Sequence, residues 1–134
     1  MFGLSPFCRI ARVRPDATGG AVPLIYKIAP AALWREAEAA GLFEGSPVDR
    51  QDGFIHFSSA GQVRETAARY FAGVADLVLA AIEVERLPVP LRWEPSRGGD
   101  LFPHLYAPLD LAAVLWVKPL PLGPDGRHVL PDLA

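Results

Sequence analysis

Frequent prolines and glycines are the feature that most limits how this chain can fold. The 134 residues include 14 prolines and 12 glycines. Proline breaks the interior of a helix, and glycine favours turns. The sequence therefore predicts short elements joined by turns and argues against a bundle of long helices.

The first half of the chain predicts strands alternating with helices. Leu24–Ile28 is β-branched and aromatic, which is typical of a strand. A helix is predicted over residues 29–41, because Pro30 suits the first turn and Gly41 suits the end. The turn residues that follow, at positions 45–47, predict a loop.

A second strand and a second helix follow this loop. Gly53–Phe57 predicts a strand, and the helix is expected to start at Ser59, where Ser59 and Gln62 fit a capping box. Helical spacing predicts the buried face of this helix, made of Val63, Ala67, Tyr70 and Phe71.

The second half of the chain consists mainly of strand patterns. They cover Asp76–Val84, Leu91–Glu94, Leu101–Tyr106 and Ala113–Lys118, and a hairpin turn is expected at Pro124–Gly126. Two early helices followed by a run of strands predict an α+β fold, with both N-terminal helices packed on a mainly antiparallel, curved sheet.

Composition limits the classes of partner. The net charge of −2 lacks the basic excess of proteins that bind phosphate backbones, which argues against a nucleic-acid partner. The lone Cys8 builds no internal disulfide, and no apolar run reaches the length of a membrane helix, so we expect a cytoplasmic protein. Residues 1–22 read as a basic, poorly ordered extension, and residues 23–134 as one domain. No oligomeric state is implied.

Polar side chains on apolar strands are the candidate site residues. Alternation places His56 and Ser58 on one strand face, and His104 and Tyr106 on one face of another strand. Arg92 and Glu94 share a face of a third strand, with Trp93 on the opposite face. Buried polar groups tend to pair with each other or with a ligand, so their coincidence favours a functional pocket.

Each candidate also has a purely structural interpretation. His56 can be a neutral core histidine bonded to the backbone or to Ser58, and Glu94 can be a surface acid. A metal site of His56, His104 and Glu94 is a further alternative, although the close spacing of strong metal motifs is absent. No GxSxG pattern supports a serine hydrolase.

Several stretches together resemble a bacterial family catalogued as domain of unknown function 952. They are IYKIAPAALWREAEAAG, GSPVDRQDGFIHFSSAGQVRETAARYFAG, DLVLAAIEVERL, LRWEPSRGGDLFPHLY and PLPLGPDGRHVLP, in collinear order over about residues 23–131. The resemblance implies a small cytoplasmic protein with no assigned reaction. It also implies an ADP-ribosyltransferase-like split sheet, in which related enzymes bind NAD and cleave its nicotinamide–ribose bond.

The resemblance carries roles for particular residues. Lys27 stands in the first strand where such enzymes have histidine or arginine, and His56 and Ser58 fall at their strand–helix junction. Glu94 is the candidate for their acidic residue, whereas His104 and Tyr106 have no assigned counterpart.

Two function hypotheses follow. In the first, an ADP-ribosyltransferase-like transferase or NAD glycohydrolase binds NAD or a related nucleotide as substrate, without another certain cofactor. Its catalytic residues would be Glu94, His56 and His104, and its ligand-binding residues Ser58, Lys27, Tyr106, Arg92 and Trp93. In the second, a non-catalytic binding or interaction module uses the same pocket.

Overall fold

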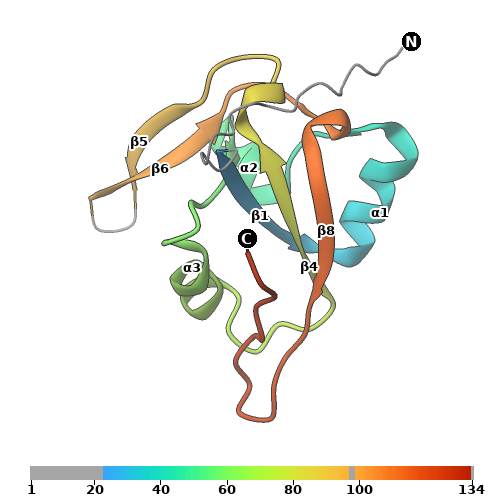
Figure 1. The fold of residues 1–134 in the computed structure, drawn as a ribbon, viewed down its shortest axis with the longest axis vertical. Coiled ribbons are helices and arrows are strands. Elements are labelled where there is room, and N and C mark those ends of the chain that lie inside the picture. The colour runs from blue at the N-terminus through green and yellow to red at the C-terminus, as the bar shows by residue number, and fades with distance from the viewer. Residues whose placement is uncertain (1–22, 97–98, 134) are drawn as a thin grey trace, which may run out of the picture.

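The computed structural model describes residues 23–96 and 99–133, and its strands form three small antiparallel sheets (Figure 1). The first sheet has the order β1-β4-β8, with β1 (Leu24–Pro30), β4 (Leu77–Glu83) and β8 (Val114–Leu120). The second has the order β3-β6-β5, with β3 (Ile55–His56), β6 (Asp100–Leu105) and β5 (Arg92–Ser96). The third joins β2 (Leu42–Phe43) to β7 (Leu109–Asp110). The predicted extension, residues 1–22 with Cys8, lies outside the described residues.

Helices alternate with the early strands. The described residues form the α-helices α1 (Ala31–Ala40), α2 (Pro47–Asp52) and α3 (Val63–Tyr70) and the 3-10 turns η2 (Val84–Arg86) and η3 (Leu111–Ala113). Helices α1 and α3 lie on opposite sides of the β1-β4-β8 sheet, and the β5–β6 hairpin extends away from it (Figure 1).

The two faces of β1 enter two different hydrophobic clusters. Ile25 and Ala29 pack with Trp34 of α1 on one face, whereas Tyr26 and Ile28 belong to the α3 side. Successive side chains of a strand point to opposite faces, so a strand that is apolar at all positions but Lys27 suits a place between two layers. Burial on both faces holds the backbone of β1 in place, so the edge of β1 that does not pair with β4 is also held in place.

Helix α2 was predicted as a loop, because it is short and the capping signal at its N-terminus differs from the usual one. Ser46 Oγ accepts a hydrogen bond from the Asp49 backbone N–H (3.4 Å), and Asp49 Oδ2 accepts one from the Ser46 N–H (2.8 Å). This is a capping box with Pro47 in the first turn. It uses aspartate in place of the usual Glu or Gln, and the helix has only six residues.

Helix α3 begins later than predicted and buries less. The Gln62 side chain does accept a hydrogen bond from the Ser59 N–H (3.0 Å), but the α-helix starts at Val63. Val63 and Ala67 are buried as expected, whereas Tyr70 is 51% exposed, so its predicted place in the core is wrong. Helical spacing identifies a face, but it does not show that the face of Tyr70 opens onto a cavity.

The predicted fold class is also wrong. The prediction was an α+β fold with two N-terminal helices packed on one mainly antiparallel split sheet of ADP-ribosyltransferase type. The described residues instead have three α-helices alternating with strands, and the strands divide among three antiparallel sheets. The missed helix α2 and the separation of β3, β5 and β6 from the first sheet account for the difference, because strand pairing is a long-range property.

We expect Gly45→Ala to destabilise the protein more than Gly41→Ala. Both glycines have positive φ, at 107° and 82°, so alanine is strained at either position. At Gly45 a Cβ would also lie 2.8 Å from Asp49 Cβ, whereas at Gly41 it would meet no atom within 4 Å. Overpacking should add about 1–3 kcal/mol at Gly45. Urea unfolding of both variants measures the difference, and equal losses would contradict the contact with Asp49.

Candidate functional site

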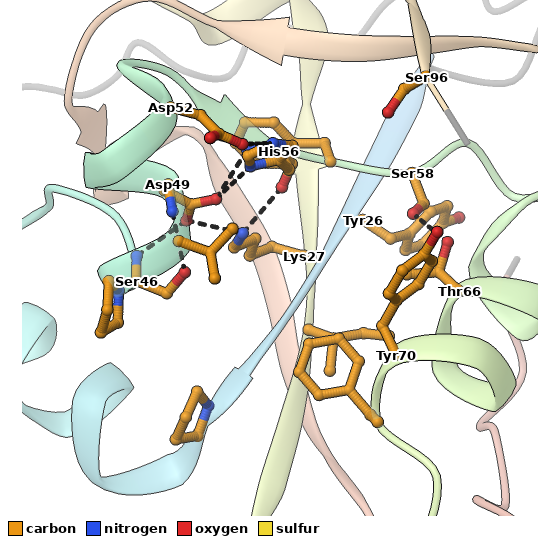
Figure 2. A pocket seen from close by; sticks show the side chains of 16 residues that line it. Tyr26, Lys27, Ser46, Asp49, Asp52, His56, Ser58, Thr66, Tyr70 and Ser96 are labelled. Atoms are coloured by element: carbon orange, nitrogen blue, oxygen red, sulfur yellow. Dashed lines mark hydrogen bonds and ion pairs between the residues drawn. The ribbon is translucent and has the colours of Figure 1, made fainter. Parts of the chain in front are cut away.

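A pocket of about 570 Å³ opens between α2, β3 and α3, beside β1 (Figure 2). Its volume falls within the range of about 300–1,000 Å³ that is typical of small-molecule sites. Its lining combines β1 residues (Tyr26, Lys27, Ile28, Pro30), the α2 region (Ser46, Pro47, Val48, Asp49, Asp52), the β3 region (His56, Phe57, Ser58), α3 and its end (Thr66, Tyr70, Phe71) and Ser96.

The outer edge of β1 forms part of this pocket. β1 is the terminal strand of its sheet, and on the edge away from β4 it pairs with Ser58 alone among the described residues. Tyr26 N–H donates to the Ser58 carbonyl (2.8 Å), and Ser58 N–H donates to the Tyr26 carbonyl (2.9 Å). Backbone groups two residues apart on a strand face the same edge. The N–H and C=O of Ile28 therefore point along the edge toward the pocket, as one donor and one acceptor.

Asp49 organises the charged wall of the pocket. Its carboxylate is 2% exposed and accepts hydrogen bonds from Lys27 Nζ (2.8 Å), from the Ser46 N–H (2.8 Å) and from both the backbone N–H (3.1 Å) and the Nδ1 (2.6 Å) of His56. Lys27 Nζ also donates to the His56 carbonyl (2.9 Å). One carboxylate thus holds together β1, α2 and β3.

The surroundings of Asp49 keep it ionised. Burial alone would raise its pKa, but the hydrogen bond from His56 and the charge and hydrogen bond of Lys27 outweigh burial and hold the pKa well below the ordinary value. An ionised Asp49 accepts hydrogen bonds and donates none, so His56 carries its proton on Nδ1 toward this carboxylate.

His56 lies between two carboxylates. Its Nε2 is 2.9 Å from Oδ2 of Asp52, the last residue of α2, four positions before His56 in the sequence. The His56 side chain is 14% exposed and that of Asp52 is 44% exposed, so this second contact is on the solvent side (Figure 2). The buried carboxylate thus orients His56 at Nδ1, and Nε2, the nitrogen through which a histidine held in this way transfers a proton, faces Asp52.

The opposite wall of the pocket carries an aromatic ring and two hydroxyl groups. Tyr70 lines the pocket and is 51% exposed (Figure 2). Ser58 Oγ and Thr66 Oγ1 lie 3.0 Å apart and are buried. The pocket therefore offers an accessible aromatic ring on one side and carboxylates on the other.

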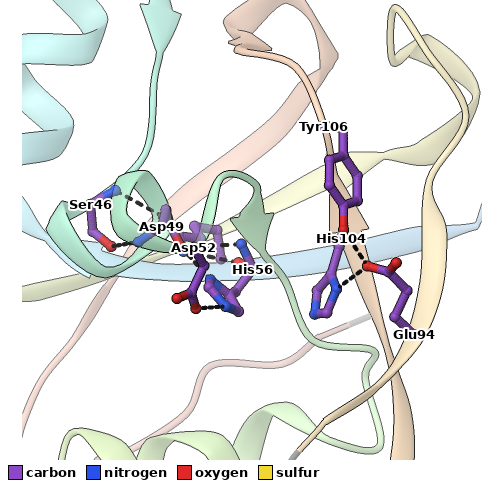
Figure 3. A network of polar contacts seen from close by, with 8 residues as sticks. Ser46, Asp49, Asp52, His56, Glu94, His104 and Tyr106 are labelled. Atoms are coloured by element: carbon purple, nitrogen blue, oxygen red, sulfur yellow. Dashed lines mark hydrogen bonds and ion pairs between the residues drawn. The ribbon is translucent and has the colours of Figure 1, made fainter.

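A second polar network surrounds Glu94 (Figure 3). His104 Nδ1 and the Tyr106 hydroxyl both contact Glu94 Oε1, each at 2.8 Å. The hydrogen bonds of His104 and Tyr106 lower the pKa of Glu94, and the bond to Glu94 raises the pKa of Tyr106. His104 is 3% exposed, its Nε2 has no hydrogen-bond partner within residues 23–96 and 99–133, and Phe54 stacks on its ring at 4.1 Å.

The two networks meet through their histidines. His56 is paired with His104 across β3 and β6, and His104 with Arg92 across β6 and β5. The two imidazole rings are 5.3 Å apart and nearly perpendicular. However, neither His104 nor Glu94 lines the 570 Å³ pocket, so the Glu94 network supports His56 from behind.

The structure separates the predicted site residues into three groups. Lys27, His56 and Ser58 line the pocket. Glu94, His104 and Tyr106 form the adjoining network, and the Arg92 guanidinium lies 4.7 Å above the Tyr106 ring. Trp93 is opposite Pro103 on the other face of the hairpin and is 48% exposed, so it joins neither network.

Sequence reasoning missed Asp49 and Asp52. Both lie in PVDRQD, which was interpreted as a loop. Two signals were present: Asp49 is the third residue after Ser46, as a capping box requires, and Asp52 precedes His56 by four positions. The alternative metal set of His56, His104 and Glu94 is not formed, because no three His, Cys, Asp or Glu residues in the described ranges could hold a metal ion. No helix among the described residues is long and apolar enough to cross a membrane.

Comparisons with known proteins find one family model and several solved structures that are similar to this chain. The model of a family described as "Protein of unknown function (DUF952)" matches residues 28–117. The crystal structure of protein CC0527 from Caulobacter crescentus is 53% identical and has a TM-score of 0.75, covering 80% of this chain and 94% of that one. The solution NMR structure of CC0527 is 54% identical with a TM-score of 0.70, covering 78% and 90%. No curated protein matches the chain.

We expect Asp49→Asn to cost about 3–5 kcal/mol of unfolding free energy, because it leaves the Lys27 charge buried without its partner. Asp52→Asn is the matched control, since Asp52 is 44% exposed and its ion pair should be worth about 1 kcal/mol or less. Urea unfolding at neutral pH measures both. Equal losses would show that Asp49 is not the organising group.

The lowered pKa of Asp49 also predicts acid sensitivity. Its carboxylate is more acidic in the folded protein than in the unfolded chain, so its stabilisation is complete above the ordinary carboxyl pKa of about 3.9 and is lost as pH falls below it. Unfolding free energies measured from pH 6 to pH 2 should therefore fall more steeply for the wild type than for Asp49→Asn. Parallel curves would contradict the ionised carboxylate.

Proposed function

The chain belongs to the DUF952 family, and we propose that its pocket binds NAD or a related nucleotide and cleaves the nicotinamide–ribose bond, passing ADP-ribose to water or another acceptor. The observation that carries the proposal is His56, which is held at Nδ1 by buried Asp49 and presents Nε2 beside half-exposed Asp52 on the pocket wall.

The proposed reaction needs a group that accepts a proton. As the bond between the ribose carbon and the ring nitrogen breaks, its electron pair stays with nicotinamide, and the ribose carbon becomes cationic. A water oxygen then bonds to that carbon and releases a proton, which neutral His56 takes at Nε2. The resulting imidazolium is held between Asp49 and Asp52, and fixed carboxylates of this kind also favour the developing positive charge of the ribose.

Two features of the pocket support a nicotinamide ligand. The N–H and C=O of Ile28 on the β1 edge suit a planar carboxamide, which both donates and accepts. Tyr70 offers an exposed ring on which a flat heterocycle can stack. The single cysteine in the chain supports the cytoplasm as the proposed compartment.

One observation favours a second candidate, a non-catalytic ligand-binding module. Lys27, Asp49 and His56 already satisfy one another, which is what a purely structural cluster would do. In that case the pocket would bind its ligand and return it unchanged.

We expect purified protein to release nicotinamide from NAD, and His56→Gln to lower kcat by about 100-fold or more, as loss of an acid–base group does. Glu94→Gln should lower kcat by less than about tenfold, because Glu94 acts from outside the pocket. Chromatographic detection of nicotinamide measures turnover, and urea unfolding checks that each variant is folded.

The assay separates the two candidates. Full turnover by folded His56→Gln would remove His56 from the catalytic role. Saturable NAD binding with no nicotinamide release by the wild type would establish the binding module instead.

A further inference from the structure

We infer that the pocket selects a planar, positively charged group, which it binds between the Asp52 carboxylate and the Tyr70 ring. The inference rests on the proposed ligand site but not on the proposed reaction. It concerns the charge of the group that enters the pocket, whatever molecule carries it.

The charges of the lining give the first argument. The lysine, aspartate and histidine residues that line the pocket are Lys27, Asp49, Asp52 and His56, and the lining contains no arginine or glutamate. Their sum is 0 when His56 is protonated and −1 when it is neutral, so in neither state do these groups attract an anion. Lys27 cannot serve as an anion anchor, because its ammonium is 7% exposed and bound by Asp49 and by the His56 carbonyl.

Neighbouring arginines do not change this balance. Arg50 of α2 contacts Glu44, 3.5 Å away, and Arg69 of α3 contacts Glu65 at 2.8 Å. Neither arginine is among the lining residues. Arg64, the other arginine of α3, does not line the pocket either, so in the described part of the chain no arginine of α2 or α3 balances Asp52 there.

Asp52 is the carboxylate that a ligand can reach. Asp49 is 2% exposed, and its oxygens already accept four hydrogen bonds. Asp52 is 44% exposed, and its one ion pair among the described residues is with His56 Nε2. The two oxygens of a carboxylate together accept about four hydrogen bonds, so Asp52 can accept one from a ligand as well as one from the imidazole. Charge-assisted bonds to a planar, forked cation are the strongest that such a group forms.

The aromatic wall favours the same ligand. Tyr70 is a half-exposed ring at the pocket, and Phe71, the next residue in the chain, also lines the pocket. A cation over the face of an aromatic ring is attracted by the ring quadrupole. A flat cation in the pocket is therefore attracted both by the Asp52 carboxylate and by the face of Tyr70, whereas an anion gains neither interaction. For a dinucleotide this places the pyridinium end inside the pocket and the phosphates outside.

Three isosteric probes test the inference without NAD: benzamidine, benzamide and benzoate share one ring and one planar substituent and carry charges of +1, 0 and −1. We expect wild-type protein to bind benzamidine about tenfold or more tightly than benzoate, with benzamide between them. In Asp52→Asn the three affinities should fall within about twofold of one another. Glu38→Gln, which removes an exposed acid of α1 away from the pocket, is the matched control and should keep the wild-type ranking.

The outcomes distinguish the failure of the inference from that of the site. Benzoate binding as tightly as benzamidine would overturn the charge selection and leave the pocket as a ligand site. An unchanged preference in folded Asp52→Asn would overturn the assignment to Asp52. If none of the three binds while NAD is still cleaved, the inference fails and the proposed function stands.

Discussion

The buried Asp49 carboxylate is the interaction on which the rest of the site depends. A charge removed from water is costly unless it is paired and fully hydrogen-bonded, and Asp49 meets that condition with donors from β1, from its own helix cap and from β3. The same contacts bring three elements together that share no sheet ladder: β1 lies in the first sheet, β3 in the second, and α2 between them. The position of His56 is thus set by a charge rather than by strand pairing alone.

The pocket exists because a strand edge is left open beside that charge. β1 contributes apolar side chains to the hydrophobic clusters on both of its faces, so its backbone is fixed even where it lacks a partner strand. Ser58 closes one position of the edge, and the edge beyond it lines the cavity. A rigid backbone with donors and acceptors, a buried ion cluster and an exposed ring are the components of a small-molecule site. The Glu94 network adds a packed support behind His56 through His104.

Local patterns predicted the elements better than their assembly. Strand and helix periodicity predicted β1 from LIYKI, α1 from the segment around Trp34, β4 from DLVLAAIEV and β6 from LFPHLY. Period-two alternation placed His56 and His104 each on a face of its own strand, and the structure adds that the two are opposite each other. The order of the strands and their division into three sheets depend on pairings far apart in sequence, which no local pattern contains. Asp49 was missed because it is a helix-cap residue and a buried ion partner at once, and Tyr70 was assigned to the core because helical spacing does not distinguish core from cavity.

The most direct test of the account is an NMR titration of the three histidine rings with NAD, assigned by single His→Gln variants. His56 lines the pocket, His104 touches His56 from behind, and His128 is bonded to the Val74 carbonyl, away from both networks. The account predicts a saturable shift that is largest for His56, smaller for His104 and absent for His128. Ring signals that stay unmoved at millimolar NAD, or that all move alike, would contradict a ligand site at His56.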